Sequence, residues 1–156
     1  SMQKYNSLAL WIFVLETVSY IIGMTIQSEV AGRYASLNRP PLAPPDIAFP
    51  IMWTTLYALI AATGWYLWRH RHNEEGEFRL IIFGIYMALN WAWSFIFFSA
   101  HLLLPGFLWI LLMNFTAIVL IVKSWREVRP ASYLMIPPTL WTLFAGYLNG
   151  AFWYVN

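Results

Sequence analysis

Long apolar stretches separated by polar connections make up most of this 156-residue chain. Five of them approach the roughly 20 residues that an α-helix needs to cross the hydrocarbon core of a bilayer. They cover residues 8–26, 49–68, 80–99, 103–124 and 133–154. Because a backbone in lipid must satisfy its own hydrogen bonds, such stretches are expected to be helical. The pattern therefore predicts an all-α integral membrane protein, a single domain over residues 1–156 built as a bundle of five transmembrane helices.

Composition supports a membrane protein over a soluble one. The chain is 60% hydrophobic and 10% charged, and its mean hydropathy is +0.58. It therefore has too little polar material to cover a soluble globule of its size. The first apolar stretch is as long as a full span and lacks a small-x-small cleavage site, so we expect a retained helix rather than a signal peptide.

The connection between the first two stretches, from about Gln27 to Ala48, is the longest and carries a proline-rich block. Residues 40–45 read Pro-Pro-Leu-Ala-Pro-Pro. Proline fixes φ and removes a backbone donor, so this block cannot be helical and should be stiff and extended. A connection of this length is usually a binding loop or a flexible segment, and the prolines argue against flexibility. We expect a capping loop between helices 1 and 2, above a ligand chamber inside the bundle.

Basic residues are distributed unevenly between the two sides that alternating helices would create. One side would hold seven and the other two, which by the positive-inside rule predicts an N-terminus inside, and a C-terminus and the capping loop outside. Topology thus explains the positive charge better than nucleic-acid binding does, because the chain has no patterned basic patch. The seven are Lys4, Arg69, Arg71, Arg79, Lys123, Arg126 and Arg129, and the two are Arg33 and Arg39.

Aromatic residues form 19% of the chain, with ten Trp, and fall into two groups. One group lies near the ends of the expected helices, where Trp and Tyr anchor at membrane interfaces. It comprises Trp11, Trp65, Trp68, Trp125, Trp153 and Tyr154. The other group shares helical faces with polar or small residues, and three such faces converging would line an aromatic chamber. These faces are Trp53 with Tyr57; Asn90 with Trp93, Ser94 and Phe97; and Trp141 with Ala145, Leu148 and Asn149.

Three Asn and one Glu are the polar anomalies inside the expected spans. An amide in lipid must be hydrogen-bonded, so Asn90, Asn114 and Asn149 should point into the bundle. For Asn114 we favour a helix-to-helix hydrogen bond, whereas for the other two a ligand contact and a structural bond are equally favoured. Glu16 lies near mid-span with no basic residue at matching depth. An intramembrane carboxyl is a functional-site hypothesis, and a carboxyl facing a water-filled cleft is the alternative.

Several chemistries lack the residues they need. The chain has no cysteine, which excludes disulfides, thiolate nucleophiles and thiolate ligation. It has no Gly-rich phosphate loop and no Ser-His-acid grouping that spacing supports. His101 lies where it could ligate a haem iron, but an interfacial surface histidine is favoured. We therefore assign no catalytic residue, no metal site and no required cofactor.

Four motifs together resemble those of the translocator proteins, also called tryptophan-rich sensory proteins or peripheral-type benzodiazepine receptors (TspO/MBR). They are Leu37-x-x-Pro40-x-Leu42-x-Pro44-Pro45; Trp53-Thr54-x-Leu56-Tyr57; Asn90-Trp91-Ala92-Trp93 with Phe97-Phe98; and Pro137-x-x-x-Trp141-x-x-Phe144-Ala145-x-x-Leu148-Asn149. The resemblance covers nearly the whole chain and is highly specific. It implies a five-helix bundle, usually a homodimer, that binds porphyrins, sterols and synthetic isoquinoline-type ligands in a pocket capped by the first loop.

Carried over position by position, the resemblance implies a ligand pocket with walls and a lid. The walls would be Trp53, Tyr57, Asn90, Trp93, Trp141, Phe144, Ala145 and Leu148, and the lid contacts Pro41, Leu42 and Pro44. Two positions depart from the family pattern. Leu42 replaces the usual lid Trp, and Gly150 and Tyr154 stand where the C-terminal sterol-recognition pattern ends in Tyr and Arg. The missing basic end weakens the expectation of tight sterol recognition.

The resemblance implies a membrane receptor or sensor that holds protoporphyrin, haem or another planar apolar ligand such as a sterol. One alternative is a carrier that moves tetrapyrroles or lipids across the bilayer. Another is a light- or oxygen-dependent porphyrin-degrading enzyme with Trp141 as its catalytic residue, which the replacement of the lid indole by Leu42 disfavours. A third is a dimeric scaffold, against which the proline-rich lid argues. The expected partners are an apolar small molecule, membrane lipid and a second copy in a homodimer, without nucleic acid.

Overall fold

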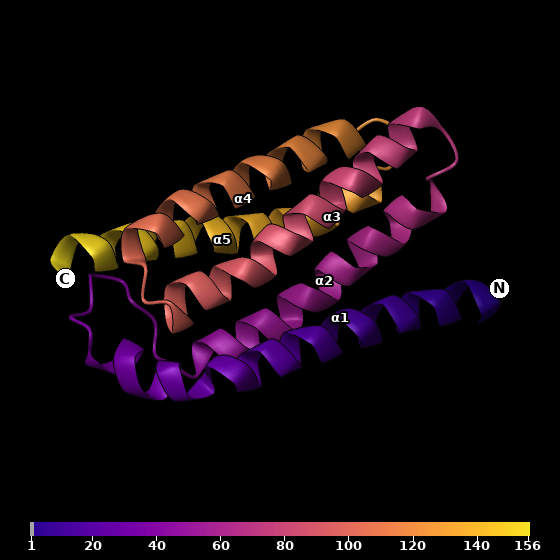
Figure 1. Ribbon diagram of the computed structural model, residues 1–156. Coiled ribbons are helices and arrows are strands. Elements are labelled where there is room, and N and C mark those ends of the chain that lie inside the picture. Colours follow the sequence, from indigo (N-terminus) through magenta and orange to yellow (C-terminus); the bar gives the residue numbers. More distant parts are fainter. Residues whose placement is uncertain (1) are drawn as a thin grey trace.

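The computed structural model describes residues 2–156, and every regular element in this part of the chain is helical (Figure 1). Ser1 lies outside the described residues. The elements are α1 (Met2–Glu29), η1 (Val30–Tyr34), α2 (Ala48–Arg69), α3 (Glu74–Ser94), η2 (Phe95–Ser99), α4 (Leu103–Ser124) and α5 (Arg129–Val155), where η denotes a π-helical segment. The prediction of an all-helical bundle is confirmed, and the two termini lie at opposite ends of it.

The connection after α1 is shorter than the sequence suggested. We expected it to start at about Gln27, but α1 continues to Glu29, and π-helical and helical turns extend it to Ser36. No proline occurs before Pro40, so nothing in this stretch removes a backbone donor or forces an extended conformation. The non-helical segment is residues 37–47, which we call the capping loop.

Three helical stretches are long and apolar enough to cross a membrane: Lys4–Gly32, Glu74–Ser99 and Leu103–Ser124. The chain is therefore a membrane helical bundle. α2 and α5 are also long, but their apolar residues are interspersed with Thr, Gly, Tyr and, in α5, an internal pair, Pro137 and Pro138. Such residues lower the hydropathy of helices that face other helices rather than lipid. Spanning by all five helices stays a prediction.

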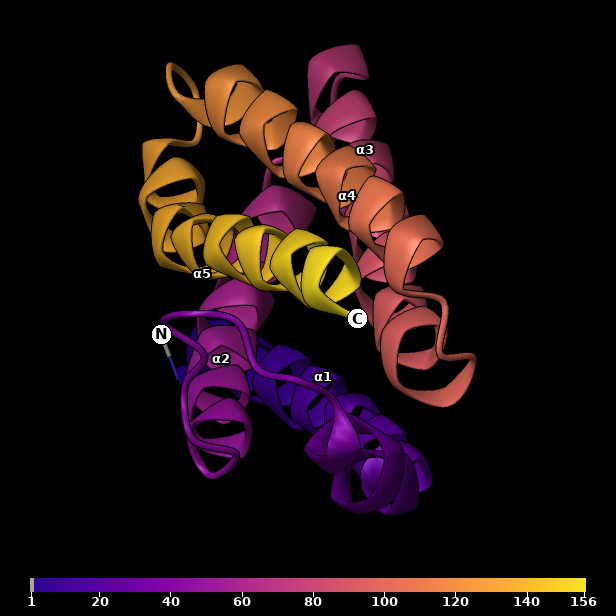
Figure 2. The same cartoon turned by 90° about the vertical axis from the view of Figure 1, so that its left-hand side faces the viewer.

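α5 lies at the centre of the packing, against α2 and α4, while α3 packs on α4 and α1 packs mainly on α2 (Figure 2). Small residues bring α4 and α5 close together. A Cβ atom on Gly150 would lie 2.9 Å from the Phe107 ring, and one on Gly106 would lie 2.9 Å from Asn149 Oδ1. Gly106 on α4 and Gly150 on α5 therefore allow these two helices to approach closely within the subunit. By contrast, only 11% of the apolar window of α1 is buried in the chain.

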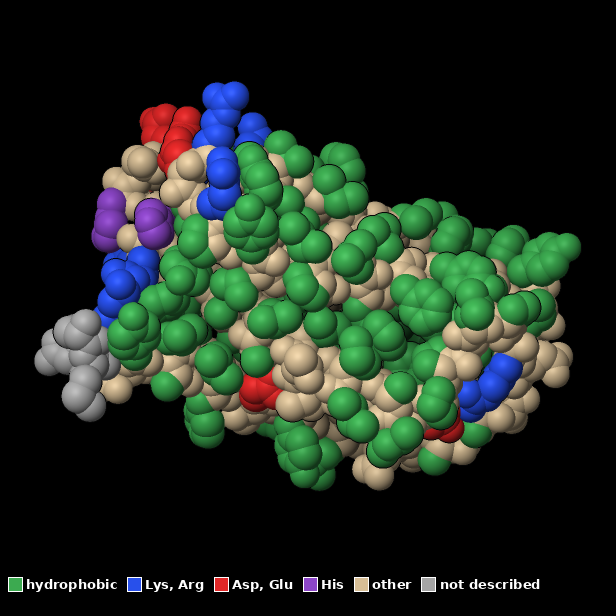
Figure 3. All heavy atoms as spheres, turned by 180° about the vertical axis from the view of Figure 1, so that it is seen from behind, with side chains coloured by type: hydrophobic (Ala, Val, Ile, Leu, Met, Phe, Trp, Pro, Cys, Tyr) green, Lys and Arg blue, Asp and Glu red, His purple; other side chains and the backbone are tan. Residues whose placement is uncertain are grey.

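Charged side chains gather at the end of the bundle that holds the α2–α3 and α4–α5 connections, and apolar side chains cover its middle (Figure 3). Local signals set the start of α3 there. Asn73 caps the helix by accepting a hydrogen bond from the Gly76 amide at 2.7 Å, and Glu74, Glu75 and Glu77 follow in the first turn. Acidic side chains at this position interact favourably with the helix dipole.

Most of the expected interfacial aromatics are exposed, as an anchoring role requires, but Trp65 is not. Its side chain is buried between α1 and α2, where Nε1 donates a hydrogen bond to Ser7 Oγ at 2.8 Å. The interfacial assignment of Trp65 is therefore wrong. Its place near a helix end suggested an anchor, but the long α1 extends past that point and covers it.

Candidate functional site

The first part of the candidate site joins α2 to α3 through a tyrosine and an amide. Trp53 and Tyr57, one helical turn apart on α2, place their ring centroids 5.3 Å from each other. The Tyr57 hydroxyl donates to Asn90 Oδ1, and Asn90 Nδ2 donates to the Tyr86 hydroxyl at 3.3 Å. Tyr57, Asn90 and Tyr86 are all buried. The Asn90 amide is thus satisfied by protein groups, and a ligand that bonded it would have to replace one of them.

The second part joins α3 to α5. Trp93 Nε1 donates to Asn149 Oδ1 at 3.0 Å, while Asn149 Nδ2 donates to the Leu103 carbonyl at 2.6 Å. The Trp93 ring also stacks on Phe97, with centroids 5.1 Å apart and planes 8° from parallel. Asn149 therefore binds α3 through its amide oxygen and α4 through its amide nitrogen, and so holds both helices to α5. The prediction that the three Asn residues point into the bundle is confirmed, since Asn114 is buried too and donates to the Thr142 carbonyl at 3.1 Å.

The third part is an aromatic cluster that contains an unsatisfied donor. The Trp141 ring on α5 lies 6.1 Å from Phe49 on α2 and 5.8 Å from Phe144. Trp141 Nε1 is buried and has no hydrogen-bond partner among the described residues. Ala145 and Leu148 are buried on the following turns of α5. A buried indole N–H without an acceptor is costly, so this atom is where the site can accommodate an acceptor from a ligand.

The capping loop is held in place by several hydrogen bonds. The Tyr147 hydroxyl donates to the Pro41 carbonyl at 2.9 Å, and Arg39 forms an ion pair with Asp46 at 2.7 Å. At the chain end, the Asn38 amide donates to Asn156 Oδ1 at 3.0 Å, and Asn156 Nδ2 donates to the Asn38 carbonyl at 3.0 Å. The loop is thus ordered against the C-terminal half of α5, which agrees with a stiff segment rather than a flexible one.

Leu42 lies at the tip of the loop and is 77% exposed, with a left-handed backbone (φ 69°). Pro40 is buried, and Leu37 and Ala43 pack against the core, so they face the bundle more closely than Leu42 does. Pro44 is half-buried, and its carbonyl accepts a hydrogen bond from Arg39. Of the expected lid contacts, then, Pro44 lies partly against the protein, while the apolar side chain of Leu42 is free to meet another molecule.

Sequence reasoning missed two aromatic residues of the site. Phe49 precedes Trp53 by one turn, so the spacing Phe49, Trp53 and Tyr57 was available as a signal in the sequence. Tyr34 fell in the expected loop, but its buried ring contacts Phe49 and lies 5.1 Å from Phe152. Burial raises the pKa of the Tyr34 phenol to about 12, so the hydroxyl is a neutral group near the capping loop.

Two candidate polar residues lie beside the aromatic clusters. Glu16 on α1 is half-buried, and its Oε1 is buried without a hydrogen-bond partner among the described residues. His101 has a left-handed backbone (φ 56°) and pairs with Glu29 at 3.2 Å, at the end of the bundle that holds the loop. Within residues 2–156, no group of three or more His, Cys, Asp and Glu side chains is placed to hold a metal ion.

The sequence of this chain is similar to one family model and to several known proteins. The family model described as "TspO/MBR family" matches residues 9–154. A "Tryptophan-rich protein TspO" of Chlorobaculum tepidum is 30% identical over 150 residues, covering 85% of this chain and 91% of the relative. A "Translocator protein" of Ovis aries is 33% identical, covering 84% and 79%. An "Uncharacterized membrane protein YtaB" of Bacillus subtilis is 36% identical, covering 74% and 75%.

Proposed function

This chain belongs to the TspO/MBR family, and on that premise we propose that it is a membrane receptor or sensor for a planar apolar ligand. The proposed ligands are tetrapyrroles, namely protoporphyrin or haem, and secondarily sterols. The site lies among α2, α3 and α5 beneath the capping loop. Its walls are Trp53, Tyr57, Asn90, Trp93, Trp141, Phe144, Ala145 and Leu148, and its lid contacts are Pro41, Leu42 and Pro44.

The observation that carries the proposal is the buried, unpartnered Nε1 of Trp141 within an aromatic cluster. A flat ligand with apolar faces gains stacking and burial against such rings. A tetrapyrrole also carries carboxylate groups that can accept the Trp141 N–H, which a purely hydrocarbon ligand cannot do. The site therefore favours a planar ligand with peripheral acceptors over a simple lipid chain.

The other polar groups of the site support a binding role in a different way. Tyr57 with Asn90, and Trp93 with Asn149, already satisfy one another and fix the spacing of the helices. Pre-organised walls reduce the entropy that a ligand must overcome. Entry then depends on the capping loop, whose bond from Tyr147 to Pro41 can open without disturbing these pairs. Leu42 would add its exposed apolar side chain as the loop covers the ligand.

The experiment is a titration of the purified protein with protoporphyrin, followed by quenching of tryptophan fluorescence. We expect saturable quenching, and for Trp141→Phe an affinity about tenfold weaker, because Phe keeps the ring and loses the charge-assisted hydrogen bond. Trp153→Phe is the matched control, since Trp153 is an exposed Trp on the same helix. Unchanged emission of the wild type, or equal affinities of the two variants, would contradict the proposal.

The same protein preparation separates the proposed receptor from its two alternatives. A carrier would move protoporphyrin into liposomes faster than protein-free controls. A degrading enzyme would consume it under illumination, and Trp141→Phe would abolish the consumption. We expect neither; for the degrading reaction in particular, Leu42 supplies no second indole beside Trp141. Turnover faster than with an irrelevant membrane protein would show that the protein is an enzyme rather than a receptor.

We also propose a single domain of five spans, a homodimer, and an orientation with the N-terminus inside and the C-terminus outside. The opposite placement of the two ends supports an odd number of crossings (Figure 1). Labelling of single cysteines introduced at exposed positions at each end, for example Asn6→Cys and Tyr154→Cys, tests orientation in sealed vesicles. Labelling of both ends from the same side would contradict it. Mass measurement in detergent tests the dimer.

A further inference from the structure

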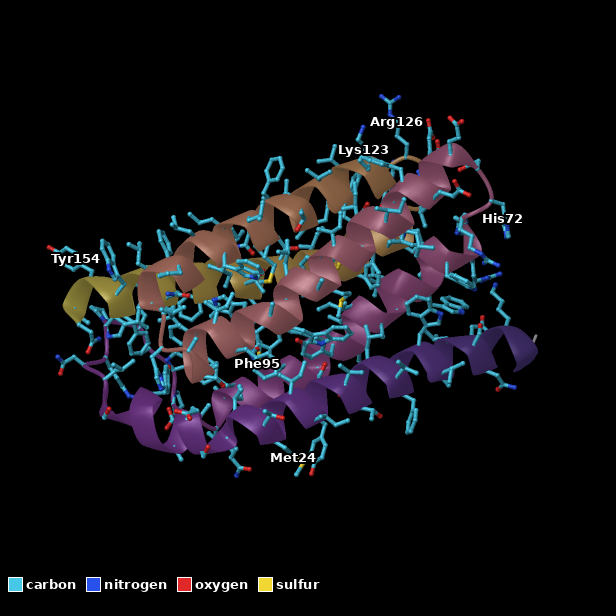
Figure 4. All side chains as sticks on the ribbon, viewed as in Figure 1. Met24, His72, Phe95, Lys123, Arg126 and Tyr154 are labelled. Carbon is cyan, nitrogen blue, oxygen red and sulfur yellow. The ribbon has the colours of Figure 1, made fainter. Side chains whose placement is uncertain are left out.

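A hollow of about 740 Å³ opens at the end of the bundle opposite the capping loop. It lies between the first turns of α3 and the last turn of α4 with the following connection. Figure 4 shows Lys123 and Arg126 extending from this place, beside oxygen-tipped side chains at the start of α3. The hollow shares no residue with the proposed tetrapyrrole site, and its position at helix ends places it at the level of the membrane interface.

The apolar wall of the hollow is formed by Phe78 on α3, Ile121 and Val122 on α4, and Trp125 after α4. Phe78 is 50% and Val122 66% exposed, so both present apolar surface outward. The Trp125 indole lies at a helix end, where amphipathic rings sit among lipid headgroups. This wall suits the glycerol and upper acyl region of a lipid rather than a water-soluble ion.

The polar lining carries both charges in equal number. Arg79, Lys123 and Arg126 are its cations, and Glu74, Glu75 and Glu127 its carboxylates. A site for an anion alone would show an excess of cations, so the balance favours a ligand that bears a positive and a negative group. Glu75 and Glu127 both line the hollow. Two adjacent carboxyls attract an ammonium group.

Arg79 supplies the observation that points to an anion. Its side chain is only 4% exposed, and Glu127 accepts a hydrogen bond from Nη2 at 3.3 Å. Nε is buried and has no hydrogen-bond partner among the described residues. Guanidinium donors left without acceptors in a buried place cost free energy, and a phosphate oxygen is an acceptor that satisfies them well. Lys123 and Arg126 lie beside it to complete the phosphate environment.

We propose that this hollow binds the headgroup of an ethanolamine phospholipid, with its phosphate at Arg79, Lys123 and Arg126 and its primary ammonium at Glu75 and Glu127. The upper acyl region lies against Phe78 and Trp125. A choline headgroup would fit less well because its quaternary nitrogen has no N–H to donate to the carboxylates. A glycerol headgroup would fit less well because it leaves the paired carboxyls without a cation.

Native mass spectrometry of the detergent-solubilised protein tests this with three lipids of identical dioleoyl chains: phosphatidylethanolamine, phosphatidylcholine and phosphatidylglycerol. We expect the ethanolamine lipid to bind about tenfold more tightly than either, the difference of about one charge-assisted hydrogen-bonded contact. Equal binding of the three lipids, or preference for phosphatidylglycerol, would overturn the proposal. Equal binding of water-soluble glycerophosphoethanolamine would overturn the role of the apolar wall.

Matched variants locate the site. Glu75→Gln and Glu77→Gln change neighbouring exposed carboxylates of the first turn of α3, but only Glu75 lines the hollow. Likewise Arg126 lines it and Arg71 does not. We expect Glu75→Gln to reduce the ethanolamine preference several-fold, and Arg126→Gln to weaken the binding of all three lipids several-fold. Glu77→Gln and Arg71→Gln should leave both the preference and the affinity intact. Equal effects within each pair would overturn the assignment, and thermal unfolding of each variant confirms that the comparison uses folded protein.

Discussion

The two ends of the bundle differ in how fully the hydrogen bonds of their buried polar side chains are satisfied. Near the capping loop, the amides of Asn90 and Asn149 are paired with neighbouring side chains and carbonyls, so they hold helices together. At the opposite end, Arg79 is equally buried but leaves Nε without a partner. A satisfied polar group in a membrane bundle is a structural tie, whereas an unsatisfied one marks a place for another molecule. The loop end also holds unsatisfied groups, namely the Trp141 indole N–H and the Tyr34 hydroxyl.

Asn149→Ala, at the end of the bundle that holds the capping loop, should lower the stability of the protein more than the other substitutions. The substitution leaves the Trp93 indole N–H and the Leu103 carbonyl without their bonds, and it opens a small cavity. We expect a loss of about 3 kcal/mol in the free energy of unfolding, measured by denaturant unfolding in detergent. Asn6→Ala, at an exposed position, is the control and should change little. Equal effects of the two substitutions would show that the Asn149 bonds do not tie α3, α4 and α5 together.

Arg79→Met should cost much less, although Arg79 is as deeply buried. Met keeps most of the volume, and the substitution removes a guanidinium that is incompletely bonded. The partner left behind, Glu127, is half-exposed and can be solvated by water. We expect a change of about 1 kcal/mol or less, in either direction. A loss as large as that for Asn149→Ala in the same unfolding assay would remove the contrast between the two ends.

Tyr147→Phe should loosen the capping loop without weakening the bundle. It removes the hydroxyl that donates to the Pro41 carbonyl and keeps the ring beside Phe144. We expect amide hydrogen exchange in residues 37–47 to speed up about fivefold, as for the loss of roughly 1 kcal/mol of local stability. Tyr154→Phe, at an exposed position, is the control. Unchanged exchange in the loop would mean that other bonds hold it.

Leu42→Gly should have the smallest effect on stability. Glycine relieves the left-handed backbone, but it also gives the unfolded chain more freedom, so we expect a net change below about 0.5 kcal/mol in unfolding free energy. The loss of an exposed apolar lid side chain should weaken protoporphyrin affinity about threefold, for about 0.6 kcal/mol of lost burial. An unchanged affinity would take Leu42 out of the site.

Helix positions could be predicted because bilayer thickness sets a length that the sequence must match. The apolar stretch over residues 103–124 coincides with α4 (Leu103–Ser124). The end of α1 was missed because the residues before Pro40 carry neither helix breakers nor a continuous apolar face. Trp65 was misassigned because its position near a helix end says nothing about which neighbouring helix covers it.

The residues of the candidate site could be predicted better than their partners. Helical spacing put Trp53 with Tyr57 on one face, but it could not show that the Tyr57 hydroxyl meets Asn90. That bond depends on how α2 and α3 are set relative to each other, which periodicity within one helix does not determine. The charged hollow was missed for a similar reason, because topology alone explained its basic residues.

The central claim is that Trp141 donates its free indole N–H to a planar ligand beneath the capping loop. The most direct test is the indole ¹⁵N–¹H resonance of Trp141, assigned by its disappearance in Trp141→Phe, during titration with protoporphyrin. We expect it to shift more than the resonances of the other nine Trp residues, of the ten in the chain, and to become protected from exchange. A stationary Trp141 resonance at saturating protoporphyrin would contradict the account.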